Sequence, residues 1–162
     1  MSLALQLPDG ATLEAMPARY VEAKQGFSIQ PPPGWKVVPG HHSNISFGPS
    51  RDKVLLTITA NTIPGQNAHA FLRQVALTMG VRIQRALPIN RQTLRTLGAD
   101  EGLRATFVAE ENEIKKQFEE IWILRKKNRI YTIVVDGEPD VRSTRRDEIR
   151  KAVLSFRILW RK

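Results

Sequence analysis

The stretch that decides the fold is G-L-R-A-T-F-V-A-E-E-N-E-I-K-K-Q-F-E-E-I-W-I-L-R-K-K-N-R-I-Y-T-I-V-V, residues 102–135. It contains three strand-like runs joined by two polar turns, at 110–113 and 126–129. In the first run, apolar residues from Leu103 to Ala109 recur at every second position, the pattern of a half-buried strand. The last run, 130–135, is rich in β-branched residues, which favour strands. The stretch therefore predicts an antiparallel meander.

The middle run is apolar on both faces. Its first face is predicted to carry Ile114, Phe118, Trp122 and Leu124. At I-W-I-L, residues 121–124, the alternation disappears, and such a strand needs cover on both sides. We expect a central strand lying between two other layers, with Trp122 almost fully buried.

The flanking sequence predicts further strands and two helices. Short apolar or alternating runs predict strands at 26–29, 35–38, 45–47 and 54–60. A first helix is expected between an N-cap at Asn67 and a C-cap at Gly80. Two shorter strands are expected at 81–85 and 89–97, separated by Pro88. A second helix after Pro139 has an apolar stripe made of Ile149, Ala152, Val153 and Phe156.

The predicted fold class is α+β, with one antiparallel sheet of six to eight strands between two main helices. Residues 1–25 are expected to form an extended lead-in, and residues 26–162 the domain. The last residues, 157–160, are expected to pair at a sheet edge. At 162 residues the chain is long enough to bury a core without disulfides.

Composition excludes some chemistry and leaves the compartment open. The chain has no cysteine, which excludes disulfides, thiolate zinc sites and cysteine nucleophiles. No apolar run approaches the ~20 residues that span a bilayer. The opening M-S-L-A-L-Q-L-P-D-G lacks the basic region and the long apolar region of a signal peptide. We expect either a cytoplasmic protein or a mature form with a replacement start.

The chain has a net charge of +9, concentrated in two segments. Residues 70–109 contribute +4 and residues 140–162 contribute +5, whereas 110–139 contribute −1. Such a field favours acidic protein partners, anionic membrane surfaces or nucleic acid. The plainer interpretation is a surface that only keeps the protein soluble.

Six arginines are the candidate partner-binding residues. Arg91 and Arg95 are expected to share a strand face, and the others cluster near the second helix: Arg142, Arg145, Arg146 and Arg150. Helical phase places several of these near the apolar stripe, so we expect the first turn to overhang the sheet and form a basic rim. Binding to single-stranded nucleic acid also requires stacking aromatics. Only Trp35 and Trp160 are predicted to be available for that role.

The sequence predicts no catalytic residues, cofactor or metal site. His41, His42 and His69 lack the spacing of zinc ligands, so we expect only weak zinc binding. Asp136, Glu138 and Asp140 could hold Ca²⁺, although acidic groups at a helix N-terminus are the favoured interpretation. No nucleophile elbow and no phosphate-binding glycine loop is present.

The order of these features resembles the PsbP-like proteins, which include the extrinsic subunit of photosystem II and bacterial DcrB-like relatives. The matching motifs are G-F-S-I-Q-P-P-P-G-W at 26–35, V-L-L-T-I-T-A at 54–60, G-A-D-E-G-L-R-A-T-F at 98–107, R-I-Y-T-I-V-V at 129–135 and A-V-L-S-F-R-I at 152–158. The resemblance implies an antiparallel sheet with a helix on either face.

The resemblance also implies a non-catalytic binding or assembly module that acts outside the cytoplasm. Its expected partner is a protein complex with an acidic surface. The alternatives are a nucleic-acid or polyanion binder and, third, a metal-dependent activity that uses the carboxylates after Val135. No small-molecule substrate is expected.

Overall fold

Three long antiparallel strands form the centre of the molecule. The structure is a computed structural model that describes residues 19–38, 44–49, 54–63, 65–109, 118–137 and 144–159. The three strands are β7 (Glu101–Ala109), β8 (Phe118–Lys126) and β9 (Arg129–Gly137). Lys127, with a left-handed φ of 55°, and Asn128 join the last two strands. The predicted meander is confirmed. Its first turn, Ile114 and the side chain of Phe118 lie outside the described residues.

These strands belong to a seven-stranded sheet in the order β3-β4-β5-β9-β8-β7-β6. The remaining strands are β3 (Lys36–Val38), β4 (Asn44–Gly48), β5 (Val54–Thr62) and β6 (Val81–Pro88). Strand β8 is apolar on both faces, because Trp122 and Leu124 belong to one core and Ile121 and Ile123 to the other. The prediction of a central strand with cover on both sides is confirmed, and Trp122 is 3% exposed.

Helix α1 (Ala68–Met79) packs on the face that carries Ile121 and Ile123. The Asn67 side chain accepts a hydrogen bond from the Ala70 N–H at 2.8 Å, which satisfies one of the free amides of the first turn. Gly80, with a φ of 67°, ends the helix. Both predicted caps are confirmed.

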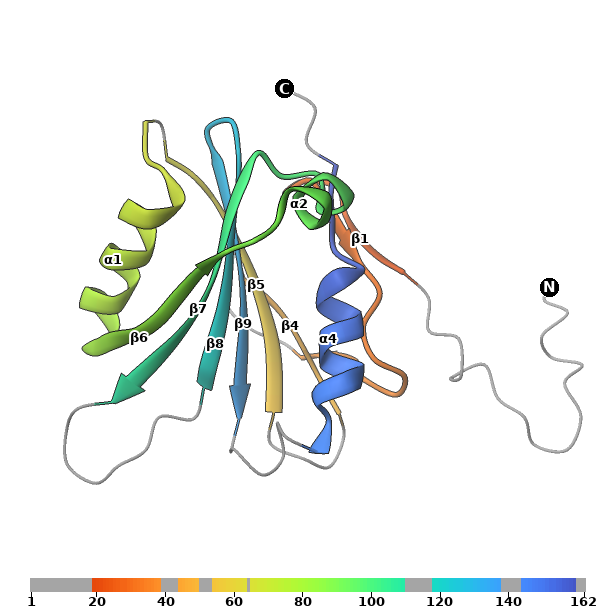
Figure 1. Ribbon diagram of the computed structural model, residues 1–162. Helices are drawn as coiled ribbons and strands as arrows, with labels where there is room; N and C mark the ends of the chain where they lie inside the picture. Colours follow the sequence, from red (N-terminus) through yellow and green to blue (C-terminus); the bar gives the residue numbers. More distant parts are fainter. Residues whose placement is uncertain are drawn as a thin grey trace, which may run out of the picture.

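The opposite face is covered by α4 (Arg146–Leu154) and by a smaller antiparallel sheet. Figure 1 shows α1 and α4 on either side of the main sheet. The smaller sheet has the order β1-β2-β10 and consists of β1 (Tyr20–Glu22), β2 (Phe27–Ile29) and β10 (Arg157–Ile158). The end of the expected lead-in is thus strand β1, and the C-terminal tail pairs at an edge, as predicted.

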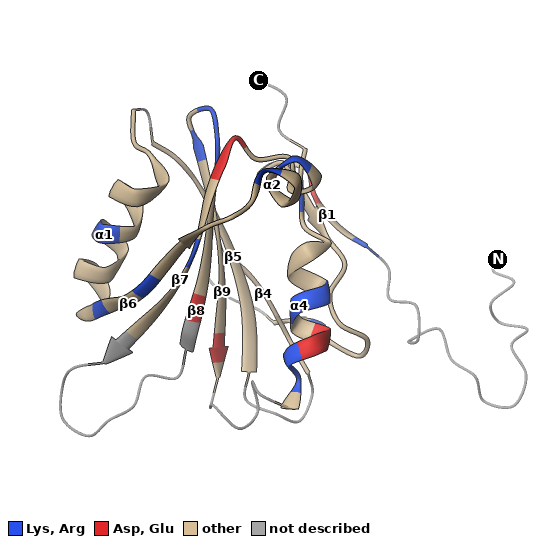
Figure 2. Cartoon of the chain, viewed as in Figure 1, with Lys and Arg blue, Asp and Glu red and all other residues tan. Residues whose placement is uncertain are grey.

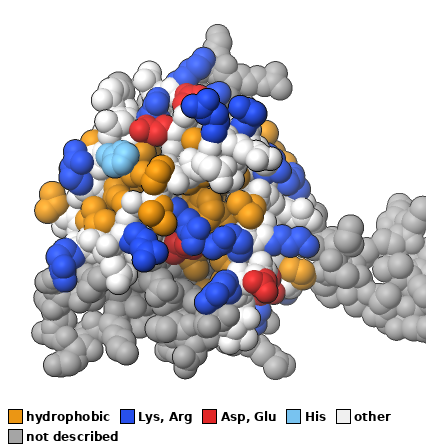
Figure 3. All heavy atoms as spheres, viewed as in Figure 1, with side chains coloured by type: hydrophobic (Ala, Val, Ile, Leu, Met, Phe, Trp, Pro, Cys, Tyr) orange, Lys and Arg blue, Asp and Glu red, His pale blue; other side chains and the backbone are white. Residues whose placement is uncertain are grey.

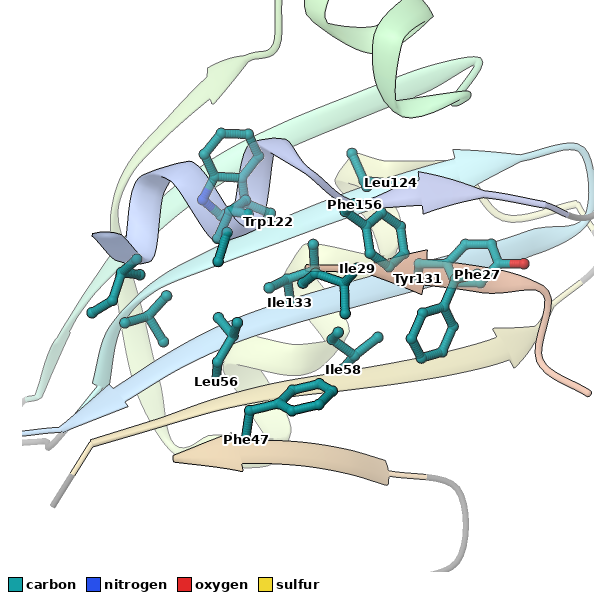
Figure 4. Close-up of a cluster of buried hydrophobic side chains, with 14 of the residues drawn as sticks. Phe27, Ile29, Phe47, Leu56, Ile58, Trp122, Leu124, Tyr131, Ile133 and Phe156 are labelled. Carbon is teal, nitrogen blue, oxygen red and sulfur yellow. The ribbon is translucent and has the colours of Figure 1, made fainter. Parts of the chain in front are cut away.

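An aromatic cluster joins the small sheet to the main sheet (Figure 4). The ring of Phe27 stacks on that of Phe156 with their centroids 5.4 Å apart, and Tyr131 meets Phe156 edge-on at 5.7 Å. The Tyr131 hydroxyl donates a hydrogen bond to the Gln25 carbonyl at 2.9 Å, and burial raises the pKa of this hydroxyl. The cluster therefore fixes β2 and the residue that follows α4 against the main sheet.

The segment 89–97, predicted as a strand, instead contains a helix, α2 (Arg91–Leu97). The Asn90 side chain accepts a hydrogen bond from the Thr93 N–H at 2.8 Å, and Gly98, with a φ of 88°, ends the helix. Leu97 is fully buried. These two caps define a short helix where a strand was predicted. The preceding segment forms the single strand β6, which continues to Pro88 rather than ending at 85.

Candidate interaction surface

One edge of the main sheet is formed by β6, whose last five residues, 84–88, are all exposed. Figure 1 is viewed onto this edge, with α1 on one side and α2 and α4 on the other. The exposed residues include the apolar run Ala86, Leu87 and Pro88, and the side chain of Leu87 is 46% exposed. This edge therefore presents both apolar groups and backbone to solvent.

The two sequence-predicted arginines of the middle segment, Arg91 and Arg95, lie on α2 beside this edge. The prediction that they share a strand face is wrong. They share a helix face, because residues four apart lie one above the other on a helix. Both are exposed, and they line an open hollow of about 470 Å³ together with Ile89, Leu94, Ala99 and Asp100. The hollow is too open and too polar to resemble an enclosed small-molecule site.

The predicted rim near the second helix is only partly brought together. Arg146 is exposed and Arg150 is half-buried on α4, whereas Arg142 lies outside the described residues. Arg145 serves a structural role, because its Nη1 donates to Glu148 Oε2 at 2.7 Å. The same carboxylate oxygen accepts a hydrogen bond from Trp35 Nε1 at 3.2 Å. Arg145 therefore helps to anchor α4 to the chain before β3.

Sequence reasoning missed two arginines on β6, Arg82 and Arg85. Both are exposed, and a register shift between Ile83 and Arg85 leaves Gln84 as the extra residue of a β-bulge. The excess charge of residues 70–109 was the available signal. It could not place the two residues at a sheet edge, because strand order is not visible in the sequence.

Six arginines on β6, α2 and α4 make up what we call the arginine face: Arg82, Arg85, Arg91, Arg95, Arg146 and Arg150. Figure 2 shows basic positions on β6, α2 and α4, and Figure 3 shows Lys and Arg side chains over these elements, around apolar ones. Five of the six form no ion pair or hydrogen bond from their side chains within the described part of the chain; they are Arg85, Arg91, Arg95, Arg146 and Arg150.

Nearby carboxylates are already paired with other cations. Glu120 Oε2 accepts from Arg104 Nε at 2.6 Å, and the Arg104 guanidinium lies 5.5 Å from the Trp122 ring centroid. Glu101 Oε1 accepts from Arg125 Nε at 2.7 Å. Burial alone would raise the pKa of Glu101, but the hydrogen bonds from Arg125 and from the backbone of α1 outweigh burial and hold this pKa below its usual value. Within the described part of the chain, these internal pairs leave five arginines of the face without an ion pair: Arg85, Arg91, Arg95, Arg146 and Arg150.

The described residues give little support to a metal site or to the stacking of nucleic-acid bases on aromatic rings. Among them, no three histidine, aspartate or glutamate side chains are grouped as metal ligands. His69 is exposed on α1 and Asp136 lies on β9, whereas His41, His42, Glu138 and Asp140 lie outside the described residues. Trp35, predicted to be available for stacking, is only 7% exposed. Trp160 also lies outside the described residues.

The arrangement of two helices around an antiparallel sheet is shared with solved structures. Cyanobacterial PsbP (CyanoP) from Synechocystis sp. PCC 6803 superposes with a TM-score of 0.63 at 13% identity, over 87% of this chain and 91% of that protein. The chain has a PsbP-like fold. A protein from Bacteroides thetaiotaomicron VPI-5482 matches with a TM-score of 0.52 at 8% identity. That match covers 90% of this chain, which spans about half (49%) of the Bacteroides protein.

No protein-family model and no curated protein sequence matches the chain. The PsbP-like fold confirms the resemblance predicted from the order of the sequence motifs. The similarity to these solved structures concerns the architecture of the chain and not its function. None of the helices in the described part of the chain combines the length and the apolar character needed to cross a bilayer.

Proposed function

We propose that the chain is a non-catalytic binding or assembly module that docks an acidic protein partner on the arginine face. The observation that carries this proposal is that, within the described part of the chain, every arginine of that face except Arg82 lacks an ion pair. Three carboxylates on the neighbouring elements, Glu101, Glu120 and Glu148, are each paired with an arginine outside the face. Asp100, which lines the hollow with Arg91 and Arg95, lies with its Oδ1 3.7 Å from Lys126 Nζ. A partner with carboxylates at matching positions would gain charge-assisted hydrogen bonds without breaking an internal ion pair.

The apolar residues among the arginines favour a protein over a simpler polyanion. Protein interfaces have an apolar centre and a polar rim, and arginine is enriched in them. Leu87 on β6 and Leu154 on α4 are 46% and 39% exposed, respectively. A nucleic acid would use the same positive charge, but single-strand binders add exposed aromatic rings. Trp35, the described candidate for that role, is buried.

The fold supports the proposal in a general way. A PsbP-like fold is compatible with a binding module, and the described residues show no grouped metal ligands. The extracytoplasmic location that the resemblance favours stays a prediction. Association of the arginine face with an anionic membrane surface is a further use of the same charge, and the experiment below includes it.

The experiment compares two triple variants with the same change in net charge. The face variant replaces Arg85, Arg91 and Arg146 with glutamine, one residue each from β6, α2 and α4. The control variant replaces three exposed lysines elsewhere with glutamine: Lys24, Lys36 and Lys127. Each protein is tested for folding by circular dichroism and for binding to poly-L-glutamate, a 20-base-pair duplex, single-stranded DNA and phosphatidylserine vesicles.

We expect the face variant to lose affinity for poly-L-glutamate by roughly tenfold to a hundredfold, as three exposed ion pairs of ordinary strength would give. The control variant should keep most of its affinity. An equal loss in both variants would mean that net charge alone governs binding. Preferential binding to the duplex, with a salt slope near −0.9 per phosphate contacted, would favour the nucleic-acid alternative. Preference for the vesicles would favour a membrane surface instead.

A further inference from the structure

Strand β6 is an edge strand of the main sheet, and no described segment pairs with its outer side. We propose that this outer side receives an extended acidic segment of the partner as an additional β-strand. The inference rests on the proposed function and specifies how the partner binds. The occupant is a strand with carboxylates on one face and apolar side chains on the other.

Hydrogen bonding at the end of β6 shows which of its backbone groups face outward. The Ile89 N–H donates to the Gly102 carbonyl at 3.1 Å, so Gly102 directs its backbone groups towards β6. Backbone direction alternates along β7, so Arg104, Thr106 and Val108 also direct their groups towards β6. Their partners in the register are Leu87, Arg85 and Arg82. The paired residues of β6 that alternate with them are Val81, Ile83 and Ala86, and these direct their backbone N–H and C=O groups outward. Gln84, the extra residue of the bulge, has no partner in the register.

Pro88 fits the same alternation. Its register partner Leu103 directs its backbone towards β8, so the backbone groups of Pro88 face outward. At this position any other residue would expose an N–H to solvent, and proline has none. The outer side of β6 therefore offers donors at Val81, Ile83 and Ala86, and none at Pro88. A partner strand that added to this edge would gain backbone hydrogen bonds without displacing any described segment.

The side chains of β6 determine the kind of strand that fits. Arg85 is paired with Thr106 and Leu87 with Arg104, on the face of the sheet that also carries Trp122. Ile83 is paired with Phe107 on the opposite face, against the α1 core. A strand beside β6 would therefore place one set of side chains next to Arg82 and Arg85 and the alternate set next to Ile83 and Ala86, on the face that carries the α1 core. Acidic and apolar residues in alternation satisfy both faces.

The same features count against a second copy of this chain as the occupant. Two β6 strands paired with each other would bring arginines close together, and like charges in cross-strand positions are destabilising. The bulge at Gln84, the arginines and Pro88 are all features by which proteins prevent edge-to-edge association. Carboxylates on an incoming strand would turn the arginines from repulsive to attractive, so the edge discriminates between occupants by charge.

The test uses two capped eight-residue peptides with the same four carboxylates. One alternates glutamate with valine and can form a strand, whereas the other alternates glutamate with proline and lacks every second N–H donor. Binding is measured with the intact chain, with Ala86→Pro, which removes an outward-facing N–H, and with Ala86→Val, which keeps it. Amide hydrogen exchange of the intact chain is followed by NMR at Val81, Ile83 and Ala86.

We expect the glutamate–valine peptide to bind about tenfold more tightly than the glutamate–proline peptide, as one or two backbone hydrogen bonds would give. It should slow exchange at all three amides, and Ala86→Pro should remove its advantage while Ala86→Val should not. Equal binding of both peptides with unchanged exchange would overturn strand addition and leave the arginine face as a docking surface. Absence of binding by both peptides and by poly-L-glutamate would also overturn the proposed function. The exchange measurement decides the question even if Ala86→Pro fails to fold.

Discussion

Replacing Trp122 with alanine removes the largest side chain of β8 from the core beneath α4. Trp122 is 3% exposed and belongs to the same core as Ile133, Ile149 and Val153. Emptying a buried tryptophan site costs about 3–5 kcal/mol, because apolar contacts are lost and the surroundings close only partly around the cavity. With a urea dependence of about 2 kcal/mol per M, the midpoint should fall by about 1.5–2.5 M.

The assay is urea denaturation followed by far-ultraviolet circular dichroism, which does not depend on the deleted indole. Leu77→Ala is the matched control, because Leu77 is a large apolar residue that is 77% exposed on α1. Its midpoint should shift by no more than the equivalent of about 0.5 kcal/mol. If Trp122→Ala shifted the midpoint no more than Leu77→Ala, the central position of β8 between two cores would be refuted.

Three further changes test local features of the fold. Because the folded pKa of Glu101 lies below its unfolded value of 4.5, the stability that Glu101 contributes is complete above that value and is lost as the pH falls through the folded pKa. The difference in unfolding free energy between the natural chain and Glu101→Gln should therefore shrink in acid, and a difference that grew in acid would contradict the pairing with Arg125. Gly98→Ala should lower the melting temperature more than Gly80→Ala, since both have left-handed φ angles but only the first would place a Cβ 3.2 Å from the Ile158 carbonyl oxygen. Asn90→Ala should cost about 1 kcal/mol in urea denaturation, and an unchanged midpoint would mean that Asn90 does not cap α2.

The main sheet could be predicted from the sequence because its information is local. Alternation in residues 103–109 and the doubly apolar run at 121–124 each specify which faces of a strand are buried. The caps of α1, Asn67 and Gly80, are equally local signals. Helix α2 was missed because its seven residues are too few to show a clear helical period. Its caps, Asn90 and Gly98, were the more reliable signals.

The arginine face could not be assembled from the sequence. Arg85 and Arg146 lie far apart along the chain and approach the same side of the molecule only through the order of the strands and the placement of α4. Composition located the charged segments, but it could not separate Arg145, which pairs with Glu148, from the uncompensated Arg146 beside it. That distinction depends on three-dimensional partners rather than on residue type.

The most direct test of the central claim, that the arginine face recognises acidic partners, is the rate of association with poly-L-glutamate as ionic strength rises from roughly 0.02 M to 0.2 M. Screening over this range shortens the reach of exposed charges, so a steered association should slow as salt is added. The natural chain and the Lys24, Lys36 and Lys127 control variant should show fast, strongly salt-dependent association. The Arg85, Arg91 and Arg146 face variant should associate more slowly and with a shallower dependence on salt. Identical rates and salt dependence in the two variants would contradict the claim.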